Sequence, residues 1–240
     1  MRKAIVSGAN GFVGSAVVKE LISQGYEVYA LVRENHYDQV PINEMVRIVP
    51  FSLENIEALG EVIPINEYEA FYHFAWNGSA GVDRADTALQ LKNAQWTVEC
   101  LQMAKRLGCK RFVPAGSIME HETIAAVYTQ GNRPGAGYIY GSGKVAAHMM
   151  CMSMAVKEGI NLVWPKITNA YGPSERSPRL VNSTIRKCIA GEDPQFTAGT
   201  QNYDFVYIDD VARAFRLIGE KGKPFHHYLI GSGKAKALKE

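Results

Sequence analysis

The sequence is poor in cysteine and carries almost no excess of charge. Four cysteines occur among 240 residues, and they form neither a Cys-x-x-Cys pair nor a metal-type cluster, so we expect no metal site. Scattered thiols suit a reducing compartment better than a secreted disulfide framework. The formal net charge is +2 without runs of like charge, which argues against nucleic-acid and anionic-membrane partners.

Long apolar runs are also missing. No stretch approaches the length of a membrane span, and Met1 leads into an apolar strand without a signal-peptide core. Internal repeats and low-complexity tracts are absent as well. The sequence therefore predicts a soluble cytoplasmic protein that does not bind membranes, with one large globular unit and a smaller lobe.

The chain does contain short apolar runs that alternate with longer amphipathic ones, the pattern of a parallel sheet with crossover helices. The expected strands are 3–7, 27–32, 47–51, 70–74, 111–115 and 162–166, and the expected helices are 13–24, 53–62, 87–107, 138–157 and 180–190. After Pro173 the chain becomes richer in polar residues, Pro and Gly. We expect a sheet domain over 1–173 and a partial substrate-binding lobe over 174–240, with 204–230 returning to the sheet.

A glycine-rich turn follows the first expected strand and opens the first helix. Glycines at this place permit a tight turn and close approach of a pyrophosphate to the helix N-terminus. The residues expected to contact a dinucleotide here are Gly8, Asn10, Gly11, Phe12, Val13 and Gly14. The sequence thus predicts an α/β fold of the Rossmann type, a doubly wound parallel sheet that binds NAD or NADP; a glycine turn without a ligand is the alternative.

The end of the second expected strand bears on the choice of dinucleotide. A carboxylate there would bind the ribose 2′-hydroxyl of NAD, but this chain has Val32 followed by Arg33. A guanidinium pairs with the 2′-phosphate of NADP. We therefore favour NADP over NAD, the alternative being an arginine that is simply solvated.

Tyr140 and Lys144 are four residues apart and so share one face of an expected helix. A nearby ammonium favours the phenolate and makes a tyrosine a usable acid or base near neutral pH. Ser117 follows the expected strand 111–115, whose carboxyl end faces the cofactor crevice, so its hydroxyl is placed to bind a substrate oxygen. We predict that Ser117, Tyr140 and Lys144 are catalytic.

These residues, together with further blocks along nearly the whole chain, resemble the extended short-chain dehydrogenase/reductases, the NAD-dependent epimerase/dehydratase family. The blocks are, in order, Gly8 to Gly14, His73-Phe74-Ala75, Asn93, the trio just described, Asn169-Ala170-Tyr171-Gly172-Pro173, and Tyr203 to Ala212.

The resemblance implies hydride transfer at C4 of a sugar linked to a nucleoside diphosphate. Tyr140 would be the acid or base, Lys144 would orient the ribose, and Ser117 would polarise the C4 oxygen. It also implies a homodimer that pairs the two long helices. The remaining residues expected at the cofactor are Ser52, Leu53, Phe74, Ala75 and Asn93, and those expected at the substrate are Glu120, Asn169 and Arg179.

The chain departs from the family pattern in several places. Sugar 4,6-dehydratases carry an Asp-Glu pair after the catalytic hydroxyl residue, whereas Ile118 and Met119 stand here, so we do not expect dehydration. Glu120 resembles the Gly-Ser-x-x-Glu of some 4-keto sugar reductases, although it could be a surface residue of a loop. An arginine that often contacts the diphosphate is replaced by Tyr203, and Arg176, Arg179 or Arg186 could substitute.

The likeness runs to Glu240 and stops within what resembles the opening of a helix, so we expect either a truncated chain or a compact variant. Three functions remain open at this point. The first is an NADP- or NAD-dependent 4-ketoreductase or 4-epimerase of a nucleotide sugar. The second is a reductase of a ketone or aldehyde that is not a sugar. The third is a dinucleotide-binding scaffold without catalysis.

Overall fold

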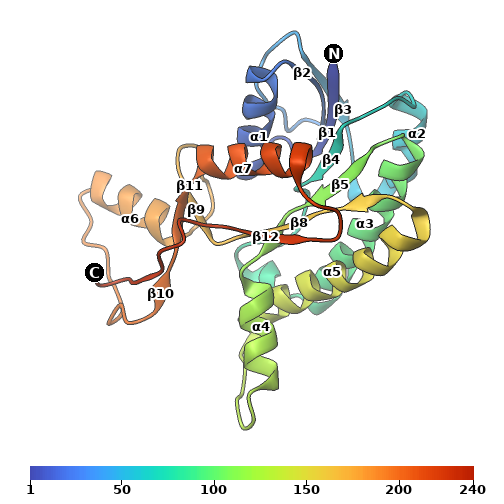
Figure 1. Cartoon of the computed structure of the whole chain (residues 1–240). Coiled ribbons are helices and arrows are strands. Elements are labelled where there is room, and N and C mark those ends of the chain that lie inside the picture. The colour runs from blue at the N-terminus through green and yellow to red at the C-terminus, as the bar shows by residue number, and fades with distance from the viewer.

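A computed structural model describes residues 1–240 and builds them around one parallel sheet (Figure 1). Six strands lie in the order β3-β2-β1-β4-β5-β7, all parallel. Their bounds are β1 Arg2–Ser7, β2 Tyr26–Val32, β3 Val46–Pro50, β4 Ala70–His73, β5 Arg111–Pro114 and β7 Asn161–Leu162. The strand order reverses between β1 and β4, which opens a crevice at their carboxyl ends. The predicted doubly wound Rossmann-type fold is confirmed.

The sheet continues beyond its carboxyl edge as a second set of parallel strands. β6 (Gly116–Ser117) follows β5, β8 (Trp164–Ile167) follows β7, and β12 (His227–Ile230) lies beside β8. The single strand expected over 162–166 is therefore two strands. The break arises because the backbone changes partner: the Val163 amide donates to the Phe112 carbonyl, whereas the Trp164 amide donates to the His226 carbonyl.

Helices cover both faces of the sheet. Figure 1 shows α1 (Phe12–Ser23) and α7 (Ile208–Lys221) together on one side, with α3 (Thr87–Arg106) and α5 (Ile139–Glu158) on the other. A hydrophobic core lies on each face of the sheet. Alternate residues of one strand pack into the two cores, because successive side chains of a strand point to opposite faces. Ile5 packs in the core beneath α3 and α5, and its neighbour Val6 packs in the core beneath α1 and α7.

Two helical segments differ from the expectation. The helix predicted over 53–62 is a 3₁₀ helix, Leu53–Ala58, and one turn of α helix, α2 (Leu59–Val62), because Asn55 has non-helical backbone angles. Residues expected to form a loop after Ser117 make a helix instead, α4 (Met119–Tyr128). Short 3₁₀ helices also lie at Val82–Ala85 and Ala136–Tyr138.

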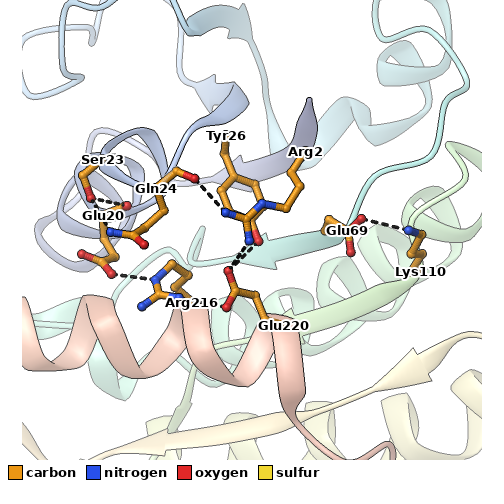
Figure 2. Close-up of polar contacts among 9 residues, drawn as sticks. All are labelled: Arg2, Glu20, Ser23, Gln24, Tyr26, Glu69, Lys110, Arg216 and Glu220. Carbon is orange, nitrogen blue, oxygen red and sulfur yellow. Dashed lines mark hydrogen bonds and ion pairs between the residues drawn. The ribbon is translucent and has the colours of Figure 1, made fainter.

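A group of charged side chains ties α7 to the amino-terminal part of the sheet (Figure 2). Glu220 accepts hydrogen bonds from Arg2 on β1, from the Tyr26 hydroxyl on β2 and from Arg216 one turn earlier on α7. Arg216 also pairs with Glu20 of α1 at 2.7 Å. The last helix is thus held to the first two strands and the first helix across about 200 residues of sequence.

The remaining elements form a smaller lobe, which Figure 1 shows extending from the carboxyl edge of the sheet. It contains α6 (Leu180–Ile189), the parallel pair β9 (Asn169–Tyr171) and β11 (Phe205–Tyr207), and the antiparallel pair β10 (Asn202–Tyr203) and β13 (Lys236–Ala237). None of the residues of α6 is buried. The helices of the chain include none with the length and apolar character needed to span a membrane.

Candidate active site

The glycine turn between β1 and α1 packs tightly enough that side chains are excluded. Gly8 has φ of 66°, and a Cβ there would lie 2.8 Å from the Ala75 amide nitrogen. A Cβ at Gly14 would collide with the Gly8 carbonyl oxygen. The first helix therefore begins directly behind the turn, with its free N–H groups facing the crevice. This cradle fits the pyrophosphate of a dinucleotide, which favours helix N-termini.

A cavity of about 690 Å³ runs from this turn along the carboxyl edge of the sheet, and we call it the cofactor cavity. Thirteen of the fourteen residues predicted for cofactor binding line it: Gly8, Asn10, Gly11, Phe12, Val13, Gly14, Arg33, Ser52, Leu53, Phe74, Ala75, Tyr140 and Lys144.

Asn93 is the exception, because it does not line the cofactor cavity. Its side chain is buried and bonded to the backbone of Asn77, accepting from the amide at 2.9 Å and donating to the carbonyl at 2.8 Å. The expected direct contact with the cofactor is therefore corrected: Asn93 of α3 holds the segment that follows β4.

A second cavity of about 1300 Å³ adjoins the first, on the side of the smaller lobe, and we call it the substrate cavity. Ser117 and Tyr140 line both cavities, and Lys144 lines the cofactor cavity beside them. The predicted trio is thus brought together where the two spaces meet, although its members come from β6 and α5.

The Lys144 ammonium lies in a buried pocket beneath Tyr140. Its Nζ donates to the Ala115 carbonyl at 2.9 Å and sits 3.4 Å from the centroid of the Trp76 ring, a cation–π distance. Burial lowers the pKa of Lys144 to about 7. The ring of Trp76 also meets the Tyr140 ring edge-on at 6.0 Å. Trp76, which also lines the cofactor cavity, therefore belongs to the site.

Tyr140 is itself buried, and burial raises the pKa of its phenol. Arg179, Arg84 and Ser117 act in the opposite direction and limit that rise. The guanidinium of Arg84 lies 4.2 Å from the centroid of the Tyr140 ring. Sequence reasoning missed Arg84 because nothing local to positions 82–85 marks it. The signal for Trp76 was available, since it directly follows the His73-Phe74-Ala75 block.

The residues expected at the substrate divide into two groups. Asn169 and Arg179 line the substrate cavity, as do Ile118 and Met119. Glu120 lines neither cavity and is only 1% exposed, so the expectations of a substrate contact and of a surface loop are both corrected. The reason is α4, whose first turn directs the side chain inward toward Trp164, not toward the cavity.

Three arginines were proposed to replace the absent diphosphate ligand, and they are placed differently. Arg176 and Arg179 line both cavities and Arg186 lines the substrate cavity, so the three differ in their protein partners and not in access. Arg176 pairs with Asp38 at 2.7 Å, so it joins the smaller lobe to the segment after β2. Arg186 donates to the Glu175 carbonyl at 3.2 Å from α6. Arg179 is therefore the arginine best placed for an anionic part of a ligand.

Comparisons with known proteins identify a family over nearly the whole chain. The model of the NAD dependent epimerase/dehydratase family matches residues 4–231. The chain is 27% identical to CDP-abequose synthase of Salmonella muenchen, over 100% of this chain and 78% of the relative. It is 24% identical to dTDP-glucose 4,6-dehydratase of Escherichia coli, over 95% and 71% of the two chains.

Solved structures of similar fold include enzymes with bound sugar nucleotides or dinucleotides. UDP-glucose 4-epimerase from Thermotoga maritima, solved with UDP-glucose, superposes with a TM-score of 0.81 at 23% identity, covering 99% of this chain and 79% of that one. An enzyme from Bordetella bronchiseptica in complex with NAD⁺ superposes with a TM-score of 0.79 at 21% identity, covering 99% and 75%.

Proposed function

The chain belongs to the NAD dependent epimerase/dehydratase family, and on that premise we propose that it transfers hydride at C4 of a sugar linked to a nucleoside diphosphate. The reaction is either reduction of a 4-keto sugar or 4-epimerisation. The observation that carries the proposal is that Ser117 and Tyr140 line both cavities, with Lys144 beside them. A hydroxyl and a phenol at such a junction reach a sugar oxygen and a nicotinamide at the same time.

The chemistry assigned to each side chain follows from its bonds. The bound nicotinamide supplies or accepts the hydride. Ser117 Oγ accepts from the Met119 amide at 3.2 Å, so its O–H remains free to donate to the sugar oxygen. The Tyr140 phenol gives its proton to that oxygen when the carbonyl is reduced, and its phenolate takes the proton when the alcohol is oxidised. The cations Lys144 and Arg84 stabilise the phenolate between these steps.

We propose NADP as the preferred cofactor. Arg33, at the carboxyl end of β2, lines the cofactor cavity together with His36, and no carboxylate occupies the position after Val32. Isothermal calorimetry with NADPH and NADH tests the choice. Tenfold tighter binding of NADPH, about 1.4 kcal/mol, is expected to fall away in Arg33→Ala. Equal affinities, or NAD retained through purification, would remove the preference and favour the epimerase.

Dehydration is not part of the proposal, even though a dTDP-glucose 4,6-dehydratase is among the relatives. The two residues after Ser117, Ile118 and Met119, present apolar side chains to the substrate cavity. Neither transfers a proton. A nucleotide hexose can be incubated with the protein and formation of a 4-keto-6-deoxy sugar monitored by its absorbance in alkali. Detection of that product would contradict the absence of dehydration.

The test of the whole proposal is turnover of nucleotide sugars by the purified chain. CDP-, UDP- and dTDP-linked hexoses and 4-keto-6-deoxy sugars are incubated with cofactor, with NADPH oxidation followed at 340 nm and sugar configuration by proton NMR. Tyr140→Phe is expected to lower kcat by roughly a thousandfold and to leave cofactor affinity unchanged. Tyr138→Phe is the matched control, because Tyr138 lines neither cavity.

Other outcomes point to the other functions that the sequence left open. Turnover of small ketones or aldehydes with no nucleotide attached would replace the sugar substrate with a simple carbonyl compound. Cofactor binding without any turnover, equal in wild type and Tyr140→Phe, would indicate a dinucleotide-binding scaffold. Unchanged turnover in Tyr140→Phe would refute the catalytic assignment.

A further inference from the structure

A buried carboxylate lies directly behind the loop that carries Ser117. Glu120 Oε1 accepts from the Ser117 amide at 2.9 Å and from the Trp164 indole at 3.0 Å. Its Oε2 lies 2.9 Å from His148 Nδ1 and 3.4 Å from Lys166 Nζ. Because an ionised carboxylate only accepts hydrogen bonds, His148 carries its proton on Nδ1. Four donors from β6, β8 and α5 therefore converge on one side chain.

The surroundings of Glu120 are shaped to receive it. Trp164 is stacked on His148 with ring centroids 4.3 Å apart, which keeps both donors in place. A Cβ at Gly116 would lie 2.7 Å from Glu120 Oε1, so glycine at that position is what admits the carboxylate. Burial by itself would raise the pKa of Glu120, but the bonds from His148, Ser117 and Trp164 and the charge of Lys166 hold it below its usual value.

A simpler role for Glu120 would be that of a helix cap. Ser117 Oγ accepts from the Met119 amide while Glu120 reaches back to the Ser117 amide, which resembles the reciprocal bonds of a capping box. A capping glutamate needs no further partners, however, and Glu120 has three. Burying a carboxylate costs several kcal/mol unless its charge is matched, so a cap alone does not account for Trp164, His148 and Lys166.

The same bonds fix the position of the Ser117 hydroxyl. Glu120 holds the Ser117 amide, and the next amide, that of Ile118, donates to the Ile167 carbonyl of β8 at 3.0 Å. The backbone of β6, from which the Ser117 side chain extends, is thereby held beside α5, which carries Tyr140. A shift of about 1 Å in a substrate-orienting group lowers a rate by as much as a hundredfold.

We propose that Glu120 is a positioning residue that holds Ser117 in register with Tyr140 without touching substrate or cofactor. This inference rests on the proposed function, because it assigns Glu120 a part in that reaction.

The test is a double-mutant cycle on kcat. Glu120→Asp keeps the charge near Lys166 and His148 but draws the carboxylate back from the Ser117 amide. We expect kcat to fall between about tenfold and a hundredfold, with KM for the nucleotide sugar and affinity for the cofactor nearly unchanged. In a Ser117→Ala background the same change is expected to cost less than about threefold, because no hydroxyl remains to be positioned.

Controls separate positioning from folding. Glu57→Asp shortens an exposed carboxylate that pairs with Arg106, and it is expected to leave kcat unchanged. If Glu120→Asp does not fold, Glu120→Gln enters the same cycle, since it keeps the side-chain length and replaces one acceptor oxygen by a donor. Equal losses of kcat in the two Ser117 backgrounds would overturn the proposal, as would a rise in KM alone or an unchanged kcat.

A second measurement needs no substrate. Amide hydrogen exchange of the peptide containing Ser117 is expected to be roughly tenfold faster at that amide in Glu120→Asp than in wild type. Unchanged exchange would overturn the proposal by itself. If wild type turns over no nucleotide sugar, the proposed function fails, whereas the exchange result still reports whether Glu120 holds Ser117.

Discussion

The main sheet with the helices that cover it, which we call the cofactor half, and the smaller lobe are each stabilised by different interactions. Every residue of β2 is buried, and α7 packs Phe215 into the core while its charged end is tied to β1 and α1 (Figure 2). α6 buries none of its residues, and Ile189 at its end is 82% exposed. Its ties to the cavities are hydrogen bonds, such as those from Asn182 to the Glu175 and Ser177 carbonyls.

This difference indicates that the two regions contribute differently to the proposed reaction and to substrate binding. The three residues proposed as catalytic are carried by β6 and α5, and α5 packs Ala147, Cys151 and Ala155 into the core under the main sheet. The substrate cavity is lined on one side by α6, none of whose residues is buried, so we expect this segment to open at a lower cost in free energy than the main sheet. We infer that hydride transfer is supported by the rigid half and that the choice of sugar depends on the looser one.

The largest difference in stability between the two regions is expected when one apolar side chain is removed from each. Phe215→Ala should lower the free energy of unfolding by about 3–5 kcal/mol, because it leaves a cavity in a fully buried core. Ile189→Ala should change it by less than about 0.5 kcal/mol. Urea denaturation followed by circular dichroism measures both, and similar losses would show that α6 is packed as firmly as α7.

The acid side of the stability profile should depend on His73 in the cofactor half. Burial lowers the pKa of His73 to about 3, whereas an unfolded histidine titrates near 6.5. Between these values the unfolded chain binds a proton that the folded chain does not, so stability falls as the pH is lowered, by up to about 1.4 kcal/mol per pH unit.

Urea denaturation between pH 7 and pH 4 in wild type and His73→Gln checks this slope. The substitution should flatten it, and His226→Gln, at an exposed site, should leave it as in wild type. An unaltered slope in His73→Gln would assign the acid sensitivity to other groups.

The charged contacts of α7 should contribute less than its apolar core. Glu220→Gln removes the charge that accepts from Arg2, Tyr26 and Arg216, with an expected loss of about 1–2 kcal/mol in the free energy of unfolding. Glu57→Gln, in an exposed ion pair with Arg106, should produce no measurable change. Thermal unfolding compares the two, and equal midpoints would mean that the contacts of Glu220 drawn in Figure 2 add nothing to stability.

The smallest effect is expected from a substitution in the smaller lobe, and it should alter substrate binding. Asn182→Ala releases the Glu175 and Ser177 carbonyls, so the segment beside the substrate cavity loosens. KM for the sugar nucleotide should rise roughly three- to tenfold with kcat unchanged. Ser183→Ala, one residue further along α6, should leave KM as in wild type. A fall in kcat in Asn182→Ala would show that the lobe positions the catalytic residues too.

The homodimer that the family resemblance implies would involve the cofactor half. α3 and α5 lie together on one face, where Met149 and Met150 of α5 are exposed. Light scattering tests whether these helices pair between two copies, and a monomeric mass would refute it.

Much of the fold could be predicted because it depends on local patterns. The apolar strands and the glycine turn are contiguous in sequence, and the predicted strand bounds differ from the observed ones by a residue or so. The exceptions have tertiary causes. The strand at 162–166 is divided because its neighbours change from β5 to β6 and β12, and the 53–62 helix is interrupted at Asn55.

The glycine turn, the parallel sheet and the three residues at the junction of the cavities could all be predicted from the amino-acid sequence, because each depends on residue type and short spacing. The folded structure was needed to show that Glu120 is buried behind Ser117, that Asn93 holds a loop, and that Trp76 and Arg84 flank Tyr140. The physical reason is distance along the chain: Glu120 meets Trp164 across 44 residues, and a contact of that span is created only when the strands assemble.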